Sequence, residues 1–273
     1  FGIYFPSSGT LTIDNSTINA KTMGAQVCSG NLNVTAGSAI TVSGDPVEKL
    51  EGDGAIQDGA AISIVNRPGY KGLGQIAIAG GTFTAKDDNA AIKAYTWDSS
   101  TKQGSAFDNS AKTVAVSGGT FSSAVSADLC AEGCTPVANA DGTYGVGVPV
   151  AQIGDKVFTS LQAAIDAAPR KATVKLLADT KENVTISTRY VTLDLNGHTL
   201  NGSTGERKPA LTVTNYVYVK DSSAAQTGTI MREDTAENSG VSSHYVIDVQ
   251  DSGWLFFQGG NVKNDSGAGG TKG

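Results

Sequence analysis

The sequence predicts an all-β fold, namely a right-handed parallel β-helix with one short capping α-helix near residues 159–168. Three observations lead to this prediction: an eight-residue motif that recurs along the chain, a composition rich in Gly, Ser, Thr, Asn and Val, and one amphipathic segment that interrupts the strand pattern. An antiparallel sandwich is the alternative, but the chain lacks hairpin signals at regular intervals of about 8–12 residues.

The recurring motif is clearest in "IAIAGGTF" at residues 76–83 and "VAVSGGTF" at residues 114–121. Looser copies lie at residues 11–18, 32–40, 193–200 and 255–262, where Asn-Ser, Ala-Gly, Asn-Gly or Gly-Gly fills the central pair. A duplicated catalytic loop would not tolerate this variation. The motif therefore indicates a structural unit, a strand followed by a corner and a second short strand.

Alternating apolar residues place one face of each strand inward, while Gly or Asn permits a left-handed backbone at the corner. One such unit cannot bury its apolar face alone. Successive coils of roughly 20–25 residues would stack and bury a continuous column of Val, Ile, Leu and Phe. Right-handedness is expected because parallel crossover connections are overwhelmingly right-handed.

Residues 157–177, "VFTSLQAAIDAAPRKATVKLL", break the strand pattern. Thr159 and Gln162 have the spacing of a capping box, residues 161, 164, 165 and 168 share one helical face, and Pro169 lies where the helix should stop. We expect this helix to cover the apolar end of a stack of coils and to protect its open sheet edges.

A turn-rich passage just before this segment suggests a domain boundary near residue 148. Residues 1–148 would be the C-terminal part of a first β-helix, and residues 149–273 the helix-capped start of a second, truncated one. The chain begins within a strand-like pattern, so we expect it to be a segment of a longer protein.

The net charge of −6 and the pI near 4.9 argue against nucleic acid and against an anionic membrane surface as partners. No stretch approaches the roughly 20 apolar residues that span a bilayer. No cofactor motif occurs, and we expect no cofactor.

Cys130 and Cys134, in "CAEGC", are close enough in sequence to form a disulfide across a turn, whereas Cys28 stands alone. A disulfide would suit an extracytoplasmic protein, and two free thiols are the alternative. Zinc is disfavoured because no second ligand pair accompanies them.

Residues 117–146, running into residues 151–186 and then "VTLDLNGHTLNG", resemble large cell-surface proteins of Gram-positive gut bacteria that carry pectin-lyase-like right-handed β-helix repeats. The resemblance covers about residues 72–202 and implies an extracellular or wall-attached, adhesin-like protein. It says hardly anything about the ligand.

A polysaccharide-cleaving site would need several carboxylates on adjacent coils. The sequence offers scattered groups only, and for each a solvated or strand-edge position is the favoured interpretation: Asp87, Asp88, His198, His244, and Arg232, Glu233, Asp234 and Glu237 in "MREDTAEN". We therefore predict no catalytic residue and no metal site.

Tyr95 and Trp97 are the predicted binding residues, because aromatic side chains in an insertion between coils could stack on a sugar or anchor a protein. The alternative is that they fold over an exposed sheet face and seal it. Trp254 is interpreted as structural.

The sequence thus favours a non-enzymatic, extracellular β-helix segment that presents a surface to host or dietary glycans or to a surface protein. The alternative is a fragment of a carbohydrate-active enzyme, a polysaccharide lyase or glycoside hydrolase of the pectin-lyase-like fold.

Overall fold

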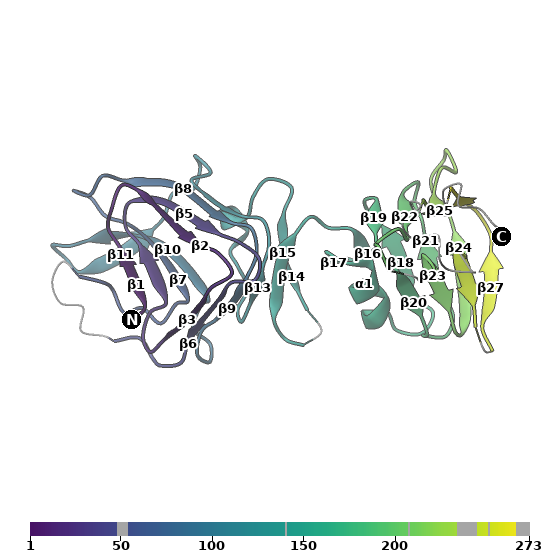
Figure 1. Ribbon diagram of the computed structural model, residues 1–273, viewed down its shortest axis with the longest axis horizontal. Helices are drawn as coiled ribbons and strands as arrows, with labels where there is room; N and C mark the ends of the chain where they lie inside the picture. Colours follow the sequence, from purple (N-terminus) through teal and green to yellow (C-terminus); the bar gives the residue numbers. More distant parts are fainter. Residues whose placement is uncertain (48–53, 140, 207, 234–244, 251, 266–273) are drawn as a thin grey trace. The chain divides into compact units, whose positions relative to one another are not determined.

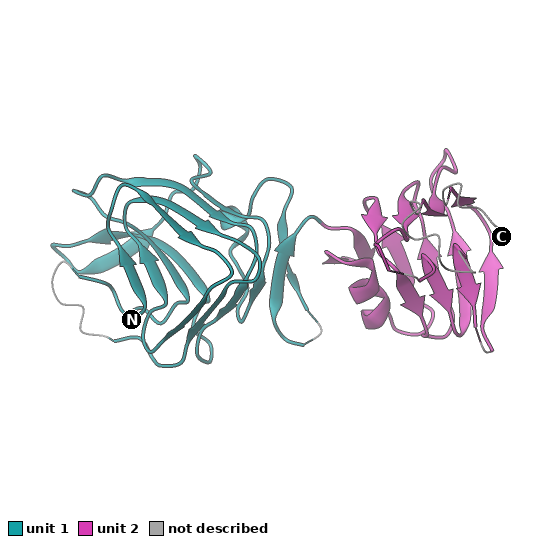
Figure 2. Ribbon diagram, in the orientation of Figure 1, with its two compact units in different colours: residues 1–148 teal, residues 149–273 magenta. Residues whose placement is uncertain are grey.

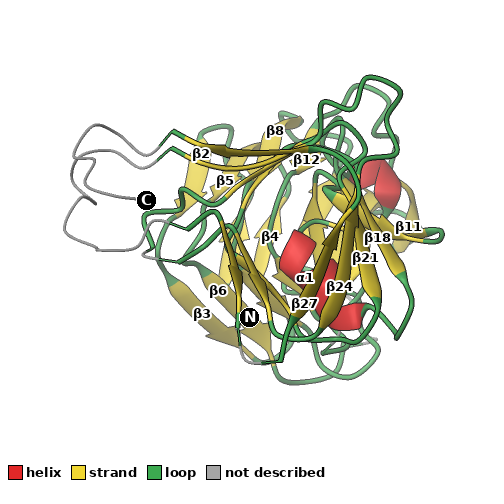
Figure 3. Ribbon diagram, turned by 90° about the vertical axis from the view of Figure 1, so that its right-hand side faces the viewer, coloured by secondary structure: helices red, strands yellow, loops and turns green. Residues whose placement is uncertain are grey.

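The computed structural model describes residues 1–47, 54–139, 141–206, 208–233, 245–250 and 252–265. The chain divides into two compact units, Phe1–Val148 and Pro149–Gly273 (Figure 2). The division falls at the turn-rich passage from which the sequence suggested a boundary. Nearly all regular structure is strand (Figure 3), and no helix in the described part of the chain is long and apolar enough to cross a membrane.

The first unit contains three sheets, named A, B and C here. Sheet A is ordered β1 (Ile3–Phe5), β4 (Ala25–Val27), β7 (Ile62–Asn66), β10 (Ile92–Asp98) and β11 (Gln103–Ala106). Sheet B is ordered β12 (Val114–Val116), β8 (Leu73–Ile78), β5 (Gly30–Val34) and β2 (Thr10–Ile13). Sheet C is ordered β14 (Thr135–Ala138), β15 (Tyr144–Gly147), β13 (Thr120–Phe121), β9 (Thr82–Thr84), β6 (Ala39–Val42) and β3 (Thr17–Ala20).

The chain visits these sheets in a fixed order. It passes from A to B to C through β1, β2 and β3, and repeats the cycle through β4, β5 and β6 and then β7, β8 and β9 (Figure 1). Each strand pairs in parallel with the strand one cycle earlier, as Leu11 with Leu32 in sheet B. Residues that alternate along these strands form one buried apolar cluster inside the unit. The predicted all-β class with parallel sheets is confirmed.

The two clearest copies of the motif lie side by side. Ile76 pairs with Val114 between β8 and β12, and Phe83 pairs with Phe121 between β9 and β13. The second glycine of each copy has a left-handed backbone, with φ of 108° at Gly81 and 113° at Gly119. The second glycine of each pair is thus required by the corner that it forms, because an L-residue rarely adopts this conformation.

Antiparallel pairing occurs at the last part of the first unit. Strand β11 forms a hairpin with β10, and β14 and β15 form another that pairs with β13. A 3₁₀ turn, η1 (Ala127–Leu129), lies between β13 and β14 and places the buried Leu129 in the apolar cluster. The β14–β15 hairpin follows the final parallel strands β12 and β13, whereas the β10–β11 hairpin precedes them.

The second unit also contains three sheets, named D, E and F. Sheet D is ordered β17 (Lys156–Phe158), β16 (Ala151–Ile153), β18 (Thr173–Leu176), β21 (Val191–Asp194), β24 (Tyr216–Lys220) and β27 (Trp254–Phe257). Sheet E is ordered β19 (Thr180–Lys181), β22 (Thr199–Asn201), β25 (Thr229–Arg232) and β28 (Asn261–Asn264). Sheet F is ordered β20 (Val184–Ile186), β23 (Leu211–Val213) and β26 (Ile247–Val249). From β18 onward the chain cycles D, E, F with parallel pairing, around a second apolar cluster.

Helix α1 (Leu161–Ala167) covers the start of this second cluster. Its buried residues Leu161, Ala164 and Ile165 pack into the cluster, as the sequence predicted. The side-chain amide of Gln162 accepts a hydrogen bond from the Thr185 backbone N–H (2.7 Å) and donates one to the Thr185 carbonyl (3.1 Å). The helix therefore satisfies backbone groups of β20 in the way a neighbouring strand would.

The predicted capping box of Thr159 and Gln162 is wrong. The helix begins two residues later than expected, with Ser160 as its N-cap. The side chain of Gln162 is hydrogen-bonded to the backbone of Thr185 and not to the start of the helix. The amide groups of the first turn instead meet the carboxylate of Glu182: the N–H groups of Leu161 and Gln162 donate to it at 2.8 and 3.1 Å. Glu182, which directly follows β19, thus adds its carboxylate to the local N-cap Ser160, whose hydroxyl accepts a hydrogen bond from the Ala163 N–H at 3.3 Å.

Candidate functional site

The predicted binding pair, Tyr95 and Trp97, lies on the outer face of sheet A but is covered. Trp97 is only 5% exposed and packs in a small cluster with Cys28, Ile56 and Val65. The Tyr95 hydroxyl donates a hydrogen bond to Asp58 Oδ2 at 2.9 Å, and burial raises the pKa of Tyr95. The indole offers no free face to a ligand, so the arrangement is that of the alternative, in which the pair seals the sheet.

The segment that covers this face is held by buried polar groups. Gln26 Nε2 donates to the Ile56 carbonyl and the Ile56 N–H donates to Gln26 Oε1, both at 2.9 Å. Asp58 accepts hydrogen bonds from the Ser63 hydroxyl (2.8 Å) and from the Ala60 N–H (3.0 Å). Because each of these groups is satisfied within the unit, we assign the cluster a structural role.

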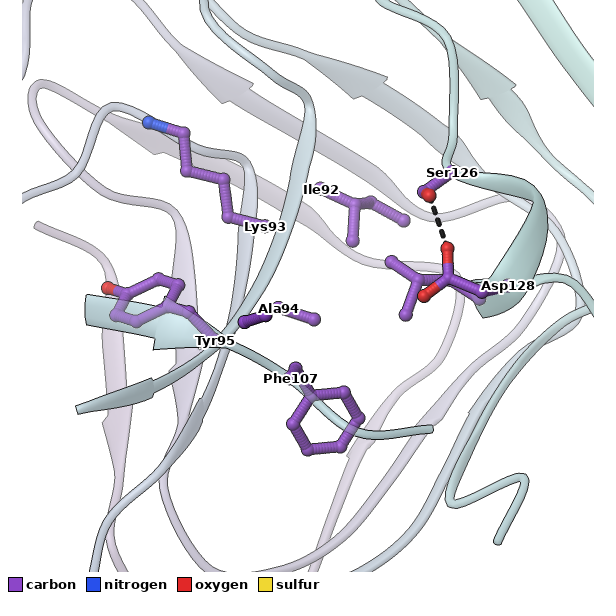
Figure 4. A pocket seen from close by; sticks show the side chains of 9 residues that line it. Ile92, Lys93, Ala94, Tyr95, Phe107, Ser126 and Asp128 are labelled. Carbon is purple, nitrogen blue, oxygen red and sulfur yellow. Dashed lines mark hydrogen bonds between the residues drawn. The ribbon is translucent and has the colours of Figure 1, made fainter. Parts of the chain in front are cut away.

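A pocket of about 400 Å³ lies beside this region, between β10 and η1. Figure 4 shows Ile92, Ala94 and Phe107 on the side of Ser126 and Asp128, whereas Lys93 and Tyr95 point away. The Ser126 hydroxyl donates to Asp128, and the Lys93 ammonium donates to the Asp58 carbonyl at 2.5 Å. An acid–base site requires polar groups that converge on a common point, and the polar groups of this pocket do not converge in this way.

The scattered polar groups singled out in the sequence are not gathered by the fold. Asp87 is exposed on a turn beside Lys86 (3.5 Å), and His198 Nδ1 lies 3.4 Å from Asp179 at a corner. Arg232 is buried, and Glu233 accepts a hydrogen bond from Asn201. Asp234, Glu237 and His244 lie outside the described residues. Across the described ranges, no group of three His, Cys, Asp or Glu side chains could hold a metal ion.

The three cysteines are free thiols. Cys130 is buried beside η1, and burial, with Cys134 and Asp128 nearby, raises the pKa of its thiol. Cys134 is half-buried, and its thiol lies 3.9 Å from the Ser117 carbonyl. Cys28 is fully buried, and burial raises the pKa of its thiol to about 11.

The second unit presents a set of aromatic side chains on the outer face of sheet D. We call this set the aromatic face. It consists of Tyr190, Tyr216, Tyr218, Trp254 and Phe256. Strand pairing aligns these residues, because Tyr216 pairs with Trp254 and Tyr218 pairs with Phe256 between β24 and β27. Trp254 is 55% exposed and Phe256 37% exposed, so the face is open to solvent.

The rings stack on one another from strand to strand. The rings of Tyr216 and Trp254 are nearly parallel (4°) with centroids 5.5 Å apart, and those of Tyr218 and Phe256 stack with centroids 4.8 Å apart. The Tyr190 ring lies 5.4 Å from that of Tyr216, tilted by 48°. Each such pair adds about 0.5–1.5 kcal/mol beyond the area it buries.

Cationic side chains border the aromatic face. The Arg170 and Arg189 guanidinium carbons lie 4.9 and 5.3 Å from the centroid of the Tyr190 ring, and Arg189 also lies 4.8 Å from that of Tyr216. Arg170 and Lys171 line a cavity of about 480 Å³ together with Tyr190, Thr192 and Tyr218. Within the described part of the chain, no carboxylate pairs with Arg170, Lys171 or Arg189.

Two residues of this site have left-handed backbones. Lys171 has φ of 69° and Tyr190 has φ of 66°, at the corners that lead into β18 and β21. Such a conformation costs a non-glycine residue roughly 1–2 kcal/mol. Elsewhere in the chain this conformation is adopted mostly by Gly and Asn, for example Asn196 and Gly197, and also by Asp87, Lys102, Lys112 and Gln226. The two residues with this backbone strain, Lys171 and Tyr190, both line the cavity.

The spacing of aromatic residues in the sequence could have indicated this site, but Trp254 was interpreted as structural. Tyr216 and Tyr218, and likewise Trp254 and Phe256, are two apart on strands, which places each pair on one face.

Comparisons of the chain with protein-family models, with curated proteins and with solved structures found no match. The geometry of the aromatic face is therefore the basis for the functional proposal.

Proposed function

We propose that both units are parallel β-helices and that the chain is a non-enzymatic, adhesin-like segment of an extracellular surface protein. The repeated passage of the chain through three sheets, with parallel pairing and an apolar interior in each unit, supports the β-helix assignment. The resemblance of residues 72–202 to bacterial cell-surface repeat proteins supports the extracellular location.

The single observation that carries a binding role is the aromatic face together with its cations, which pair with no carboxylate of the described residues. Large apolar side chains on a stable outer surface usually mark an interaction site, and aromatic and Arg residues are the types that contribute most binding energy. Trp254 and Phe256 are exposed, while Arg170 and Arg189 lie against Tyr190 without a carboxylate partner among the described residues. We infer that this face, and not Tyr95 and Trp97, is the surface that takes up a glycan.

The test is a glycan array probed with the whole chain, combined with assays for reducing ends and unsaturated products on the glycans that bind. We expect binding without turnover. Trp254→Ala should remove most of the signal, and Phe1→Ala, an equally exposed aromatic residue of the first unit, should leave it unchanged. Turnover of any bound glycan would instead support the carbohydrate-active enzyme, and an empty array would contradict the binding role.

A further inference from the structure

We propose that the aromatic face binds an anionic polysaccharide, a sugar polymer with sulfate or carboxylate groups, through Arg170, Lys171 and Arg189. This inference rests on the proposed function, because it names the ligand class of the same face. It follows from three properties of the face: the arrangement of its cations, the stacking of its rings, and the pairing of its central strands β21 and β24 on both sides.

The two guanidinium groups lie close to one aromatic ring. Arg170 and Arg189 are 4.9 and 5.3 Å from the Tyr190 centroid, and Lys171 lines the same cavity. Like charges gathered in this way repel one another unless an anion lies between them. The whole chain carries a net charge of −6, yet no carboxylate of the described residues reaches this cluster. The cluster is therefore suited to an anion supplied by a ligand.

The rings are stacked in a way that favours anions over neutral sugars. Because Tyr216 lies parallel to Trp254, and Tyr218 nearly parallel to Phe256, each ring covers one face of its neighbour. One face of each of these rings is thus used within the aromatic face, which reduces the ring area that is left to stack on a neutral sugar. Ring edges carry the positive part of the aromatic quadrupole, so rings turned edge-on attract negative groups.

An extended sugar polymer fits this face better than an acidic peptide does. Next to the cations, the backbone groups of β21 and β24 are used by the strands on both sides, so a peptide bound there has no strand edge to pair with; among the described strands of sheet D, β27 at the far side of the face has an open edge. Hydroxyl groups of Tyr190, Tyr218 and Thr192 are available as donors and acceptors around the cavity. Thr192 and Tyr218 pair on neighbouring strands, which are about 4.8 Å apart, so one extended ligand can reach both hydroxyl groups.

The experiment uses pairs of polymers that share a backbone and differ in charge. Dextran sulfate is compared with dextran, and polygalacturonate with its methyl ester, by titration against the whole chain at near-physiological salt with Trp254 fluorescence as the readout. We expect each anionic member to bind at least about tenfold more tightly than its neutral partner, with affinity falling as salt rises. Trp97→Phe should retain the fluorescence change and Trp254→Phe should abolish it, because only Trp254 lies on the face.

Matched variants assign the effect to the cluster. Arg170→Gln combined with Arg189→Gln should weaken binding to dextran sulfate by about tenfold or more, whereas Lys208→Gln, an exposed cation paired with Glu206, should change it less than about twofold. Tyr190→Asn should also weaken binding, since Asn tolerates the left-handed backbone but lacks the ring. Circular dichroism shows whether each variant is folded.

Each remaining outcome decides between the two proposals. Equal binding of neutral and anionic members would overturn the anionic ligand and leave the glycan-binding face intact. Polyglutamate binding as tightly as dextran sulfate would overturn the polysaccharide in favour of an acidic protein. Failure of every polymer to bind, with the chain folded, would overturn both.

Discussion

The ring of Phe121 stacks on the ring of Phe83, with centroids 4.9 Å apart and planes 12° from parallel. Both rings are fully buried in the first unit, and each ends one copy of the repeated motif. Phe121→Ala should lower the free energy of unfolding of this unit by about 3–5 kcal/mol, because it removes the stack and leaves a cavity. Trp97 fluorescence in a Trp254→Phe background follows urea unfolding of the first unit alone.

The control for this prediction is Phe1→Ala, which removes an exposed ring (62%) from the same unit. Its effect should stay within about 0.5 kcal/mol. Equal effects of the two substitutions would contradict the assignment of Phe121 to the core.

Gly118 is needed for space and not for its backbone angle. A Cβ atom there would lie 2.3 Å from the Ala79 carbonyl oxygen, which belongs to the neighbouring copy of the motif. We expect Gly118→Ala to destabilise the first unit by about 1–3 kcal/mol through overpacking against backbone. At Gly9 the nearest atom to such a Cβ is 3.8 Å away, so Gly9→Ala should be neutral or slightly stabilising. A neutral Gly118→Ala in the same unfolding assay would mean that the two copies do not lie against each other.

Glu182 joins helix α1 to the strands of the second unit. Its carboxylate accepts hydrogen bonds from the Leu161 and Gln162 N–H groups and from the Ser160 and Thr180 hydroxyls. Glu182→Gln should lower the free energy of unfolding of this unit by about 1–3 kcal/mol, since it weakens charge-assisted bonds at the helix start. The measurement is urea unfolding followed by Trp254 fluorescence in a Trp97→Phe background. Glu206→Gln, which removes only an exposed pair with Lys208, is the control.

The same carboxylate predicts a pH dependence. Burial raises the pKa of Glu182, but the hydrogen bonds from Leu161, Gln162, Thr180 and Ser160 outweigh burial and hold the pKa below its usual value. A lowered folded-state pKa contributes stability that is present above the unfolded-state pKa of about 4.3 and is lost as pH falls through the folded-state value. Wild type should therefore lose more stability than Glu182→Gln as pH falls below about 4. Parallel pH profiles would refute this role.

Trp254 and Trp97 should differ in their accessibility to ions. Trp254 is 55% exposed beside the cationic cluster, whereas Trp97 is 5% exposed. We expect iodide to quench Trp254 more strongly than caesium does, despite the net charge of −6, because the local potential near Arg170 and Arg189 is positive. Arg170→Gln with Arg189→Gln should remove this preference. Quenching of Trp254 by caesium in preference to iodide would show that the cluster is neutralised.

The thiols should react in the order of their exposure. Cys28 is buried and its pKa is raised to about 11, so it should resist iodoacetamide at pH 8 until the chain is unfolded. Cys134 is half-buried and should react first. Mass spectrometry of peptides after labelling measures both rates. A pair of residues 130 and 134 that labels only after reduction would show a disulfide in place of free thiols.

Local patterns in the sequence predicted the features that depend on near neighbours. Alternating apolar residues predicted the strands, as in Ile76 and Ile78, and the glycine pair predicted the corner at Gly81. The apolar spacing of Leu161, Ala164 and Ile165 predicted the helix and its buried side. These features follow from backbone periodicity and from the backbone angles that each residue type permits, so a short stretch of sequence contains them.

Tertiary structure decided which of these elements meet. Glu182 supplements the local cap Ser160 because it directly follows β19, whose position brings the carboxylate to the first turn of α1. Trp97 became a buried residue because Ile56, from a distant segment, packs against it. The aromatic face exists because parallel register brings Trp254 beside Tyr216 across a connection of many residues. The sequence by itself determined the strands and their corners, whereas the lengths and folds of the intervening loops, which follow no period, decided which outer side chains became covered and which became a surface.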